Sequence, residues 1–474
     1  MLLTVDIGTS TFKSALWNFD GKILSSYFIP LTVKSDGVKH EADPALWLKA
    51  FENSLKQLLI ISGIKNFKNI EAVVISGNGP SLVPALGAPA NKTELYVPAV
   101  NSRLWLDRRA INYQERVSDV MGGFVDAGFF LPKILFIKNE ENELYNKTKC
   151  FIGCPEYLAY ALTGEAKTVF PCEGFDRWFW NNEVLNALNL DPKKFPEFIK
   201  PGGSFGVISK EARDLFGFSR STQVISGGPD FYAAILGSGV TKPGEACDRS
   251  GSSEGINLCA ENRVTDNTLM SYRHPVKPFW NLSGIINTTG KAIEWGSGIL
   301  GFLEFNDFIN SAKKSEAGSG GLVFNPYLAG ERAPIWNPSA RAVWSGISLS
   351  SKKNDFANSI LEGIGFAIND VINVMKKNSQ TINELRVTGK LSGCDYLNQI
   401  KADITGIKVS SVLNKEAELS GLAVTGLVSL GKFFSVAEAS SMIVKIDKIY
   451  EPNLINAEIY NNLFYIYQRN ISVI

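Results

Sequence analysis

Strand-like and helix-like patterns alternate along most of this chain, and that alternation is the strongest constraint on its fold. The first 30 residues hold three strand patterns, at 2–7, 12–18 and 22–29, and "IEAVVISG" forms a later one. Between them, Asp43 is a good helix N-cap and Pro44 suits the first helical position. The apolar stripe of that helix is expected to comprise Leu46, Phe51, Leu55, Leu58 and Leu59. The alternation predicts an α/β fold.

Part of this pattern restarts near residue 240. The segment "GEACDRSGSSEGINLCA" (244–260) again reads as strand, small-residue turn and strand, directly after the breaker Pro243-Gly244. A length of 474 residues fits two or three domains of about 150 residues each. We therefore predict two related domains, 1–243 and 244–474, on either side of a cleft. The small residues of "EAELSGLAVTGLVSLG" (416–431) suit a helix that packs closely or approaches a ligand.

Composition excludes several classes of function. The formal net charge is +1, which gives no overall field to attract nucleic acid or an anionic membrane. No apolar run approaches the roughly 18 residues that span a bilayer, and Met1 leads directly into a strand pattern without a signal peptide, so we expect a cytoplasmic protein. With only two histidines, histidine-based metal sites and Ser-His-Asp catalysis are not expected. The six cysteines contain no CxxC pair, so we expect them to be buried thiols in a reducing compartment.

A carboxylate stands beside a small polar turn at the start of the chain, in "LTVDIGTSTFKSALWNFDG" (3–21). Asp6 ends the first strand pattern, and a turn of glycine and hydroxyl residues follows it. Such a turn between strands can gather backbone N–H groups into an anion-binding concavity, to which Lys13 would add positive charge. Taken alone, the pattern also fits an ordinary hairpin.

A second carboxylate follows a tight turn in "TQVISGGPDFYAAILGSG" (222–239). Here a strand pattern ends at Gly227-Gly228, and Asp230 begins a helix. A carboxylate at this position is often a simple N-cap. It can also accept the proton of a substrate hydroxyl, and phosphoryl transfer needs such a carboxylate together with phosphate-binding turns and a metal.

The ordered set of motifs resembles the FGGY carbohydrate kinases over nearly the whole chain. "DIGTSTFKSAL" is similar to the family's first phosphate motif, and "ISGNGPS" (75–81) and "LWLDRRA" (104–110) stand where sugar-contacting segments are expected. "PKILFIKNE" (132–140) and "AVWSGISLSSKKNDFANSILE" (342–362) are similar to two family signatures. "AGERAPIWNPSARAVWSGIS" (329–348) resembles the xylulokinase and gluconate kinase branches in particular.

The resemblance implies an α/β fold of two ribonuclease-H-like domains, as in actin and Hsp70, and transfer of phosphate from Mg·ATP to a sugar or polyol hydroxyl. It implies an N-terminal domain that binds sugar and a C-terminal domain that binds ATP. Asp230 matches the catalytic base, and Asp6 with Asp230 would hold Mg²⁺. The residues that it implies for the nucleotide are Gly8, Thr9, Ser10, Lys13, Gly251, Ser252, Ser253, Gly389, Lys390, Gln399 and Asp403. Those that it implies for the acceptor are Asn78, Gly79, Pro80, Trp105, Asp107, Arg108, Asp230 and Phe231.

The chain departs from the family pattern at four places. Pro80 and Asn78 replace the His and Gln of the xylulokinase segment Ser-Gly-Gln-Met-His-Gly, and Lys390 replaces a glycine of the adenosine loop. Phe136 stands where the signature has Trp, and no Arg-Glu pair of the glycerol kinase type is visible. A xylulose-like ketose is the expected acceptor, with gluconate, another sugar acid or a polyol as alternatives. A catalytically silent nucleotide-binding relative is a further alternative, and homodimers occur in the family.

Several side chains near these motifs allow two interpretations. Arg103, Arg108 and Arg109, together with Asp107, either bind a polyol or a sugar acid or form a solvated salt-bridge cluster. A sugar acid would need a cationic pocket, for which 103–109 is the candidate. Trp105 either stacks on a sugar or fills the core. Glu331 and Arg332 either serve the cleft or stabilise a turn.

Overall fold

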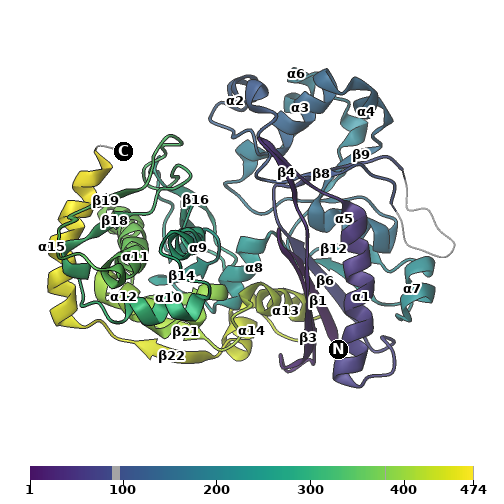
Figure 1. The fold of residues 1–474 in the computed structure, drawn as a ribbon. Coiled ribbons are helices and arrows are strands. Elements are labelled where there is room, and N and C mark those ends of the chain that lie inside the picture. The colour runs from purple at the N-terminus through teal and green to yellow at the C-terminus, as the bar shows by residue number, and fades with distance from the viewer. Residues whose placement is uncertain (88–96, 379, 473–474) are drawn as a thin grey trace. The chain divides into compact units, whose positions relative to one another are not determined.

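The computed structural model describes residues 1–87, 97–378 and 380–472, and these form two compact units (Figure 1). Unit 1 comprises Met1–Gly237 and Glu418–Ile443, and unit 2 comprises Ser238–Ala417 and Val444–Ile474. The expected division at residue 243 differs from these units chiefly at residues 418–443, which belong with the N-terminal part. The assignment of sugar binding to residues 1–243 and of ATP binding to residues 244–474 stays a prediction.

The main sheet of unit 1 has the strand order β12-β13-β6-β1-β2-β3. Strands β13, β6 and β1 run parallel, whereas β12, β2 and β3 are antiparallel to their neighbours. Their bounds are β1 Leu2–Ile7, β2 Thr11–Trp17, β3 Ile23–Pro30, β6 Ala72–Gly77, β12 Ser204–Val207 and β13 Gln223–Ser226. The three opening strands were predicted from the sequence to within one residue at each end.

The two faces of this sheet are covered by different parts of the chain. Leu3 and Val5 of β1 point into a core shared with helix α1, Pro44–Ser62. The alternate residue Leu2 packs instead with Leu422 of helix α13, Ala417–Ser429. This alternation is the period of two that strand geometry imposes on side chains.

Helix α13 packs closely because of its glycines. A Cβ atom at Gly421 would lie 1.8 Å from the carbonyl oxygen of Ala233, and one at Gly426 would lie 2.5 Å from Val74. Ala233 belongs to helix α8, Asp230–Gly237, and Val74 to β6. Of the two roles that the small residues suggested, the structure realises close packing.

Helix α1 begins and ends as the sequence predicts. The Asp43 side chain accepts a hydrogen bond from the backbone N–H of Ala45, at 2.9 Å, and Gly63 adopts a left-handed conformation at the end. Its buried stripe differs from the prediction at both ends, because Leu46 is exposed, Trp47 is buried instead, and Leu59 is only partly buried. Figure 1 shows α1 running along the main sheet of unit 1.

A second sheet of unit 1 has the order β4-β5-β8-β7-β9, and β10 pairs with β11. The strands are β4 Lys34–Asp36, β5 Lys39–Ala42, β7 Leu82–Ala85, β8 Ser102–Arg103, β9 Cys150–Gly153, β10 Thr168–Val169 and β11 Phe198–Ile199. The other helices of unit 1 are α2 Gln114–Met121, α3 Phe130–Glu140, α4 Asn142–Lys147, α5 Cys154–Thr163, α6 Asn182–Ala187, α7 Lys210–Phe216 and α14 Val436–Ile443.

Unit 2 is built on a sheet of order β16-β17-β15-β14-β20-β21-β22, beside the pair β18-β19. The strands are β14 Glu245–Ser250, β15 Glu254–Ala260, β16 Met270–Arg273, β17 Trp280–Ile286, β18 Val323–Asn325, β19 Val343–Ser345, β20 Glu384–Thr388, β21 Lys408–Val412 and β22 Ile446–Tyr450. The helices are α9 Gly290–Ile299, α10 Phe305–Ala312, α11 Lys353–Lys377, α12 Asp395–Thr405 and α15 Leu454–Ile471. The predicted strand–turn–strand at 244–260 is β14 and β15.

Three fully buried charged side chains tie α12 to the sheet of unit 2. Lys401 lies 2.6 Å from Asp248 of β14 and also contacts Glu254 of β15, and all three side chains are inaccessible to solvent. Burial and the charge of Glu254 raise the pKa of Asp248 well above its usual value. Burial also acts to raise the pKa of Glu254, but the Lys401 ammonium and the hydrogen bonds to this carboxylate together lower it. Of the two carboxyl groups, Asp248 is therefore the one whose surroundings favour the protonated form, and Glu254 the one that they favour as the anion.

Replacing Lys401 tests how much this network contributes to stability. We expect Lys401→Met to lower the free energy of unfolding by about 3–5 kcal/mol, because it leaves a buried carboxylate without its cation. Lys408→Met is the control, since Lys408 is partly exposed and lies 3.7 Å from Glu384, and a change of at most about 1 kcal/mol is expected there. Urea unfolding measures both, and equal losses in the two variants would contradict this assignment.

Two further predictions concern the whole chain. None of the six cysteines is in a disulfide, as expected, and four of them are buried, whereas Cys172 and Cys394 are partly exposed. Among the described residues, no helix is both long and apolar enough to cross a membrane.

Candidate active site

The turn between β1 and β2 has little room for side chains at its start. The N–H of Gly8 donates to the carbonyl oxygen of Thr11 at 3.0 Å, and a Cβ atom at Gly8 would lie only 2.8 Å from that oxygen. Thr9 is half-buried, and Ser10 is exposed. The turn therefore presents backbone and hydroxyl groups at the end of β1.

Lys13 lies beside this turn between two carboxylates. It is the cross-strand partner of Asp6, and its Nζ atom lies 3.8 Å from Asp6 Oδ2 and 3.4 Å from Glu418 Oε2. Asp6 is 2% exposed, so its charge acts in a poorly solvated environment. The contact with Glu418, which is 405 residues away in sequence, could not be read from local patterns.

Asp230 is held at the start of α8 by the turn that precedes it. A Cβ atom at Gly227 would lie 1.9 Å from Leu422 Cδ2, and Gly228 has a left-handed φ of 80°, so both positions favour glycine. Asp230 is half-buried, and its Oδ1 accepts the N–H of Phe231 at 2.7 Å. The Phe231 ring stacks on Phe175, with 5.4 Å between ring centroids.

The parallel strands bring Asp6 and Asp230 to one edge of the sheet. In the registers, Asp6 pairs with Ser76, and Ser226 pairs with Ile75, so β1, β6 and β13 end together. The thiol of Cys154 marks this edge. Burial, first, and then nearby carboxylates that include Asp6 and Asp230 raise the pKa of the thiol well above its usual value. Ligands of open α/β sheets bind at such carboxyl edges.

The segment 78–81 is fixed to the same edge. The Asn78 side chain is buried and donates to the carbonyl oxygen of Ile7 at 2.9 Å, while its oxygen accepts a hydrogen bond from Ser81. Gly79 is exposed and Pro80 is half-buried. Asn78 thus holds the loop, and its neighbours are the accessible part of the predicted acceptor segment.

Trp105 joins the second predicted acceptor segment to the first turn. Its Nε1 donates to Thr9 Oγ1 at 3.1 Å, and its ring is half-buried. Trp105 therefore lies beside the turn and is not fully buried in the core, and the interpretation that its ring stacks on a sugar stays a prediction.

The arginines nearby are all paired with carboxylates. Arg109 lies 2.7 Å from Glu41 and 2.8 Å from the fully buried Asp107, and Arg108 lies 3.2 Å from Asp126. Burial opposes ionisation of Asp107, but hydrogen bonds from Arg109 and from the His40 N–H hold its pKa below the usual value. The buried Asp107 carboxylate therefore holds its own segment, residues 104–110, in place.

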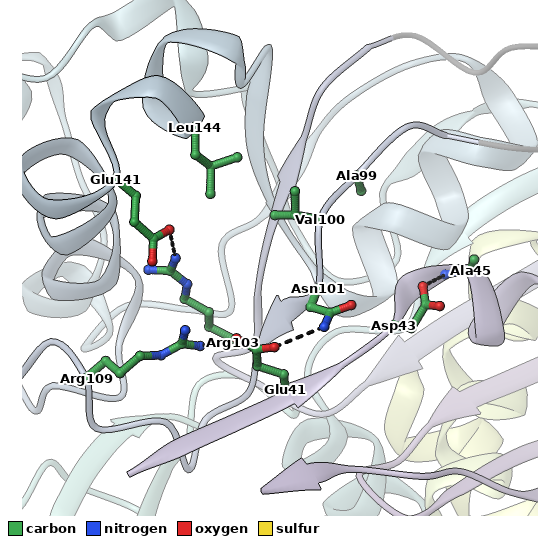
Figure 2. Close-up of a pocket in the computed structure, with 10 residues that line it drawn as sticks. All are labelled: Glu41, Asp43, Ala45, Ala99, Val100, Asn101, Arg103, Arg109, Glu141 and Leu144. Atoms are coloured by element: carbon green, nitrogen blue, oxygen red, sulfur yellow. Dashed lines mark hydrogen bonds and ion pairs between the residues drawn. The ribbon is translucent and has the colours of Figure 1, made fainter. Parts of the chain in front are cut away.

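Arg103 and Arg109 line a cavity of about 600 Å³, shown in Figure 2. Arg103 is buried and pairs with Glu141. Figure 2 also shows Asn101, which donates to Glu41 at 3.0 Å. Because carboxylates accompany both guanidinium groups, the salt-bridge interpretation of the arginines fits better than a cationic pocket. The expected solvation of that cluster is wrong at Arg103 and Asp107, which are buried.

The second predicted phosphate turn lies in unit 2, between β14 and β15. The N–H of Gly251 donates to Ser253 at 3.0 Å, and Ser252 is exposed. The start of α9 supports the turn, since the N–H of Gly290 donates to the carbonyl oxygen of Gly251 at 3.1 Å. A Cβ atom at Gly290 would lie 2.3 Å from that oxygen, so the approach requires glycine.

Gly389 packs against the same turn. It has a φ of 81°, and a Cβ atom there would lie 2.2 Å from the carbonyl oxygen of Ser250. Lys390 is exposed beside it. The structure therefore brings two of the predicted nucleotide segments together within unit 2.

Gln399 and Asp403 form hydrogen bonds with the residues at the start of α15. Asp403 accepts the N–H of Asn453 at 2.9 Å and the side-chain amide of Asn456 at 2.8 Å. Gln399 donates to Asp403 at 2.7 Å and to the carbonyl oxygen of Glu451 at 2.8 Å. These contacts give both residues a structural task, and their predicted role toward adenosine stays a prediction.

Glu331 stabilises a turn, which was one of its two interpretations. Its Oε1 accepts the N–H groups of Asn287, at 2.8 Å, and of Arg332, at 2.7 Å. Burial raises the pKa of Glu331 to about 7. Asn287 lies three residues before Gly290, so Glu331 supports the chain behind the second turn.

Sequence reasoning missed Lys133 of α3, which is fully buried. Its Nζ donates to three backbone carbonyl oxygens, of Pro80, Arg103 and Leu104. The signal was available, because a lysine stands inside the apolar run "FFLPKILFI".

Few side chains at this edge of the sheet could bind a metal ion. In the part of the chain that the structure describes, no three His, Cys, Asp or Glu side chains gather as a metal cluster. Two carboxylates at one edge nevertheless suit Mg²⁺, which keeps several waters and takes one or two carboxylates together with substrate phosphates.

Comparison with known proteins identifies the family. Residues 1–237 match the N-terminal domain, and residues 250–430 the C-terminal domain, of the FGGY family of carbohydrate kinases. The chain belongs to this family and is a sugar phosphotransferase, as the resemblance predicted. Use of ATP follows from membership of a kinase family.

Named relatives cover nearly the whole chain. A xylulose kinase of Staphylococcus xylosus is 27% identical over 98% of this chain and 99% of that protein. A gluconokinase of Bacillus subtilis is 24% identical over 93% of this chain and 90% of that protein. The crystal structure of a ligand-bound xylulose kinase from Lactobacillus acidophilus matches with a TM-score of 0.87 at 24% identity, over 100% of this chain and 98% of that one. A gluconate kinase from the same organism also gives 0.87, at 23% identity over 99% and 98% of the two chains. The predicted fold of two actin-like, Hsp70-like domains is confirmed.

Substitution of Gly8 tests the first turn. We expect Gly8→Ala to lower kcat/KM for ATP by about 100-fold, because the added Cβ would lie 2.8 Å from the Thr11 oxygen and displace the turn. Gly123→Ala is the matched control, since no atom lies within 4 Å of its Cβ position. Steady-state kinetics with varied ATP distinguish the two variants, and an equal effect of both would argue against the turn as a phosphate site.

Proposed function

We propose that this protein transfers the γ-phosphoryl group of ATP to a hydroxyl of a neutral, xylulose-like ketose, with Asp230 as general base. The observation that carries this proposal is the gathering of Asp6, Asp230 and the Gly8–Ser10 turn at one carboxyl edge of the main sheet of unit 1. The same edge holds Phe231 and the 78–81 loop, which supply a wall for the acceptor.

In this proposal, Asp230 accepts the proton of the acceptor hydroxyl as its oxygen attacks the γ-phosphorus. Its hydrogen bond from the Phe231 N–H fixes the orientation of one carboxylate oxygen. The glycines before it set the backbone position from which the side chain emerges. General-base assistance of this kind contributes about 100- to 10,000-fold.

The two small-residue turns are proposed to bind phosphate oxygens. Gly8, Thr9 and Ser10 provide N–H and hydroxyl donors in unit 1, and Gly251, Ser252 and Ser253 provide them in unit 2. Lys13 adds positive charge near Asp6. Donors held in place before the reaction stabilise developing charge without reorganisation.

Asp6 and Asp230 are the residues that would hold Mg²⁺ in this proposal. The ion would neutralise phosphate charge when bound. The low exposure of Asp6 and its contact with Lys13 keep its carboxylate in a fixed place beside the turn.

The acceptor site is proposed to comprise the 78–81 loop, Trp105, Arg108 and Phe231, with Asp107 as its support. Asn78 supports the loop in the same way, and Gly79 and Pro80 face the acceptor. On the nucleotide side, Gly389 and Lys390 stand beside the second turn, and the proposal keeps residues 244–474 as the part that binds ATP. A cytoplasmic location and a homodimer stay predictions.

A neutral acceptor is favoured over a sugar acid because the arginines are already paired. Glu41, Asp107, Asp126 and Glu141 offset the charges of Arg103, Arg108 and Arg109. The xylulose kinase relatives support a ketose, while the gluconokinase relative keeps the sugar-acid alternative for the experiment below. A silent nucleotide-binding relative is less well supported, because the chain has both carboxylates and both small-residue turns.

Replacement of the base tests the mechanism. We expect Asp230→Asn to lower kcat by about 100- to 10,000-fold while ATP still binds, because the amide cannot accept the hydroxyl proton. Asp214→Asn is the control, since Asp214 is exposed on α7. Coupled ADP release measures turnover, and near-normal kcat in Asp230→Asn would refute the assignment.

A panel of acceptors tests the substrate class. We expect D-xylulose or a related ketose to give a higher kcat/KM than gluconate or glycerol, because the paired arginines offer no net cationic site. Each acceptor is assayed with Mg·ATP and with Asp230→Asn as the blank. Preference for gluconate would replace the ketose by a sugar acid, and silence across the panel with ATP bound would favour the non-catalytic alternative.

A further inference from the structure

Lys133 is a buried cation that holds backbone and does not face solvent. It lies in the first half of α3, with no exposed surface. Its Nζ donates to the carbonyl oxygens of Leu104 at 2.7 Å, Pro80 at 2.9 Å and Arg103 at 3.2 Å. An ammonium group has three donors, and three carbonyl oxygens take them.

The carbonyl partners favour the charged form of this side chain. Burial lowers the pKa of Lys133 well below its usual value, and the nearby Asp107 carboxylate acts in the opposite direction. Carbonyl oxygens only accept hydrogen bonds, so three of them around one nitrogen require a nitrogen with three protons. A neutral amine would leave one of the three contacts without a proton.

The three carbonyl groups come from two segments that are distant in sequence. Pro80 belongs to the 78–81 loop, and Arg103 and Leu104 immediately precede Trp105. Trp105 in turn donates to Thr9 of the first turn, while Asn78 donates to Ile7 at the end of β1. Lys133 therefore adds a second link between the two segments, beside the pairing of Leu82 in β7 with Arg103 in β8. Each segment is also fastened to β1 or its turn.

We propose that Lys133 is a positioning residue that sets the spacing between the 78–81 loop and the 103–107 segment, and thereby sets the affinity for the acceptor sugar. This rests on the proposed function, which assigns the two segments to the acceptor. Lys133 has no contact with substrate in this proposal. It acts through the backbone that carries Pro80 and Trp105.

The test compares Lys133→Met, Lys133→Gln and Lys138→Met. Methionine is unbranched and one atom shorter than lysine, and it removes every donor. Glutamine keeps an amide N–H₂ with two donors. Lys138 is the matched control on the same helix, because its amine donates to the Asn189 carbonyl oxygen, which belongs to neither segment.

We expect Lys133→Met to raise KM for the acceptor about tenfold or more, with KM for ATP within about twofold of the wild type. The KM of Lys133→Gln for the acceptor is expected to lie between that of Lys133→Met and that of the wild type. Lys138→Met is expected to have the wild-type KM. Parallel rises of KM for ATP and acceptor would indicate a merely structural role and overturn the proposal. An unchanged acceptor KM in Lys133→Met would also overturn it.

Hydrogen exchange gives a readout that does not depend on turnover. In Lys133→Met, amides in peptides that cover 78–86 and 102–108 are expected to exchange faster, while those of α1 keep the wild-type rate. If the wild-type enzyme phosphorylates no acceptor of the panel, the proposed function fails, and exchange still decides the link. Unchanged exchange in both segments would refute the role of Lys133 whatever the acceptor.

Discussion

The parallel pairing of β1 with β6 and of β6 with β13 is the constraint on which the site depends. In-register parallel strands end together, so residues that follow them in sequence are brought to one edge. Asp6, Asn78 and Asp230 are separated by 72 and 152 residues along the chain, yet each stands within a few residues of a strand end. A slip of one residue in β1 would turn Asp6 to the opposite face of the sheet.

Buried charged side chains fasten loops and one helix to the rest of the fold. Asp107 binds the N–H of His40 and the side chain of Arg109, Lys133 binds three carbonyl oxygens, and Lys401 joins two strands to α12. In each case a charged group takes partners that would otherwise be unsatisfied away from water. Because such groups lose much when a partner moves, they hold their surroundings to one arrangement.

The local parts of the fold could be predicted from the sequence. The opening strands, the cap at Asp43 and the strand–turn–strand at 244–260 all depend on residues close together in the chain, and the structure has them. The stripe of α1 was wrong at Leu46, because the core takes Trp47 instead and the choice depends on what packs against the helix. The family could be identified because many weak motifs occur in one order.

What could not be predicted depends on contacts between distant segments. The pairing of Lys13 with Glu418 is one example, and the carboxylate partners of Arg103 and Arg109 are others. The sequence shows three arginines in seven residues, which allows a cationic pocket, but only the fold shows that Glu41 and Glu141 lie against them. Roles for the site residues therefore follow from the resemblance and the geometry together, and they stay proposals.

The packing of α13 on the first sheet also bears on how the protein is made. The chain leaves unit 1 after Gly237, returns at Glu418 and leaves again after Ile443. Until the ribosome has added some 180 further residues, the face of the sheet that carries Leu2, Val74 and Ile225 lacks Leu419, Leu422 and Leu427. While unit 2 is synthesised, the nascent N-terminal part therefore exposes apolar surface that α13 covers in the complete protein. A truncated gene product that stops before residue 418 would keep that surface exposed and prone to aggregation.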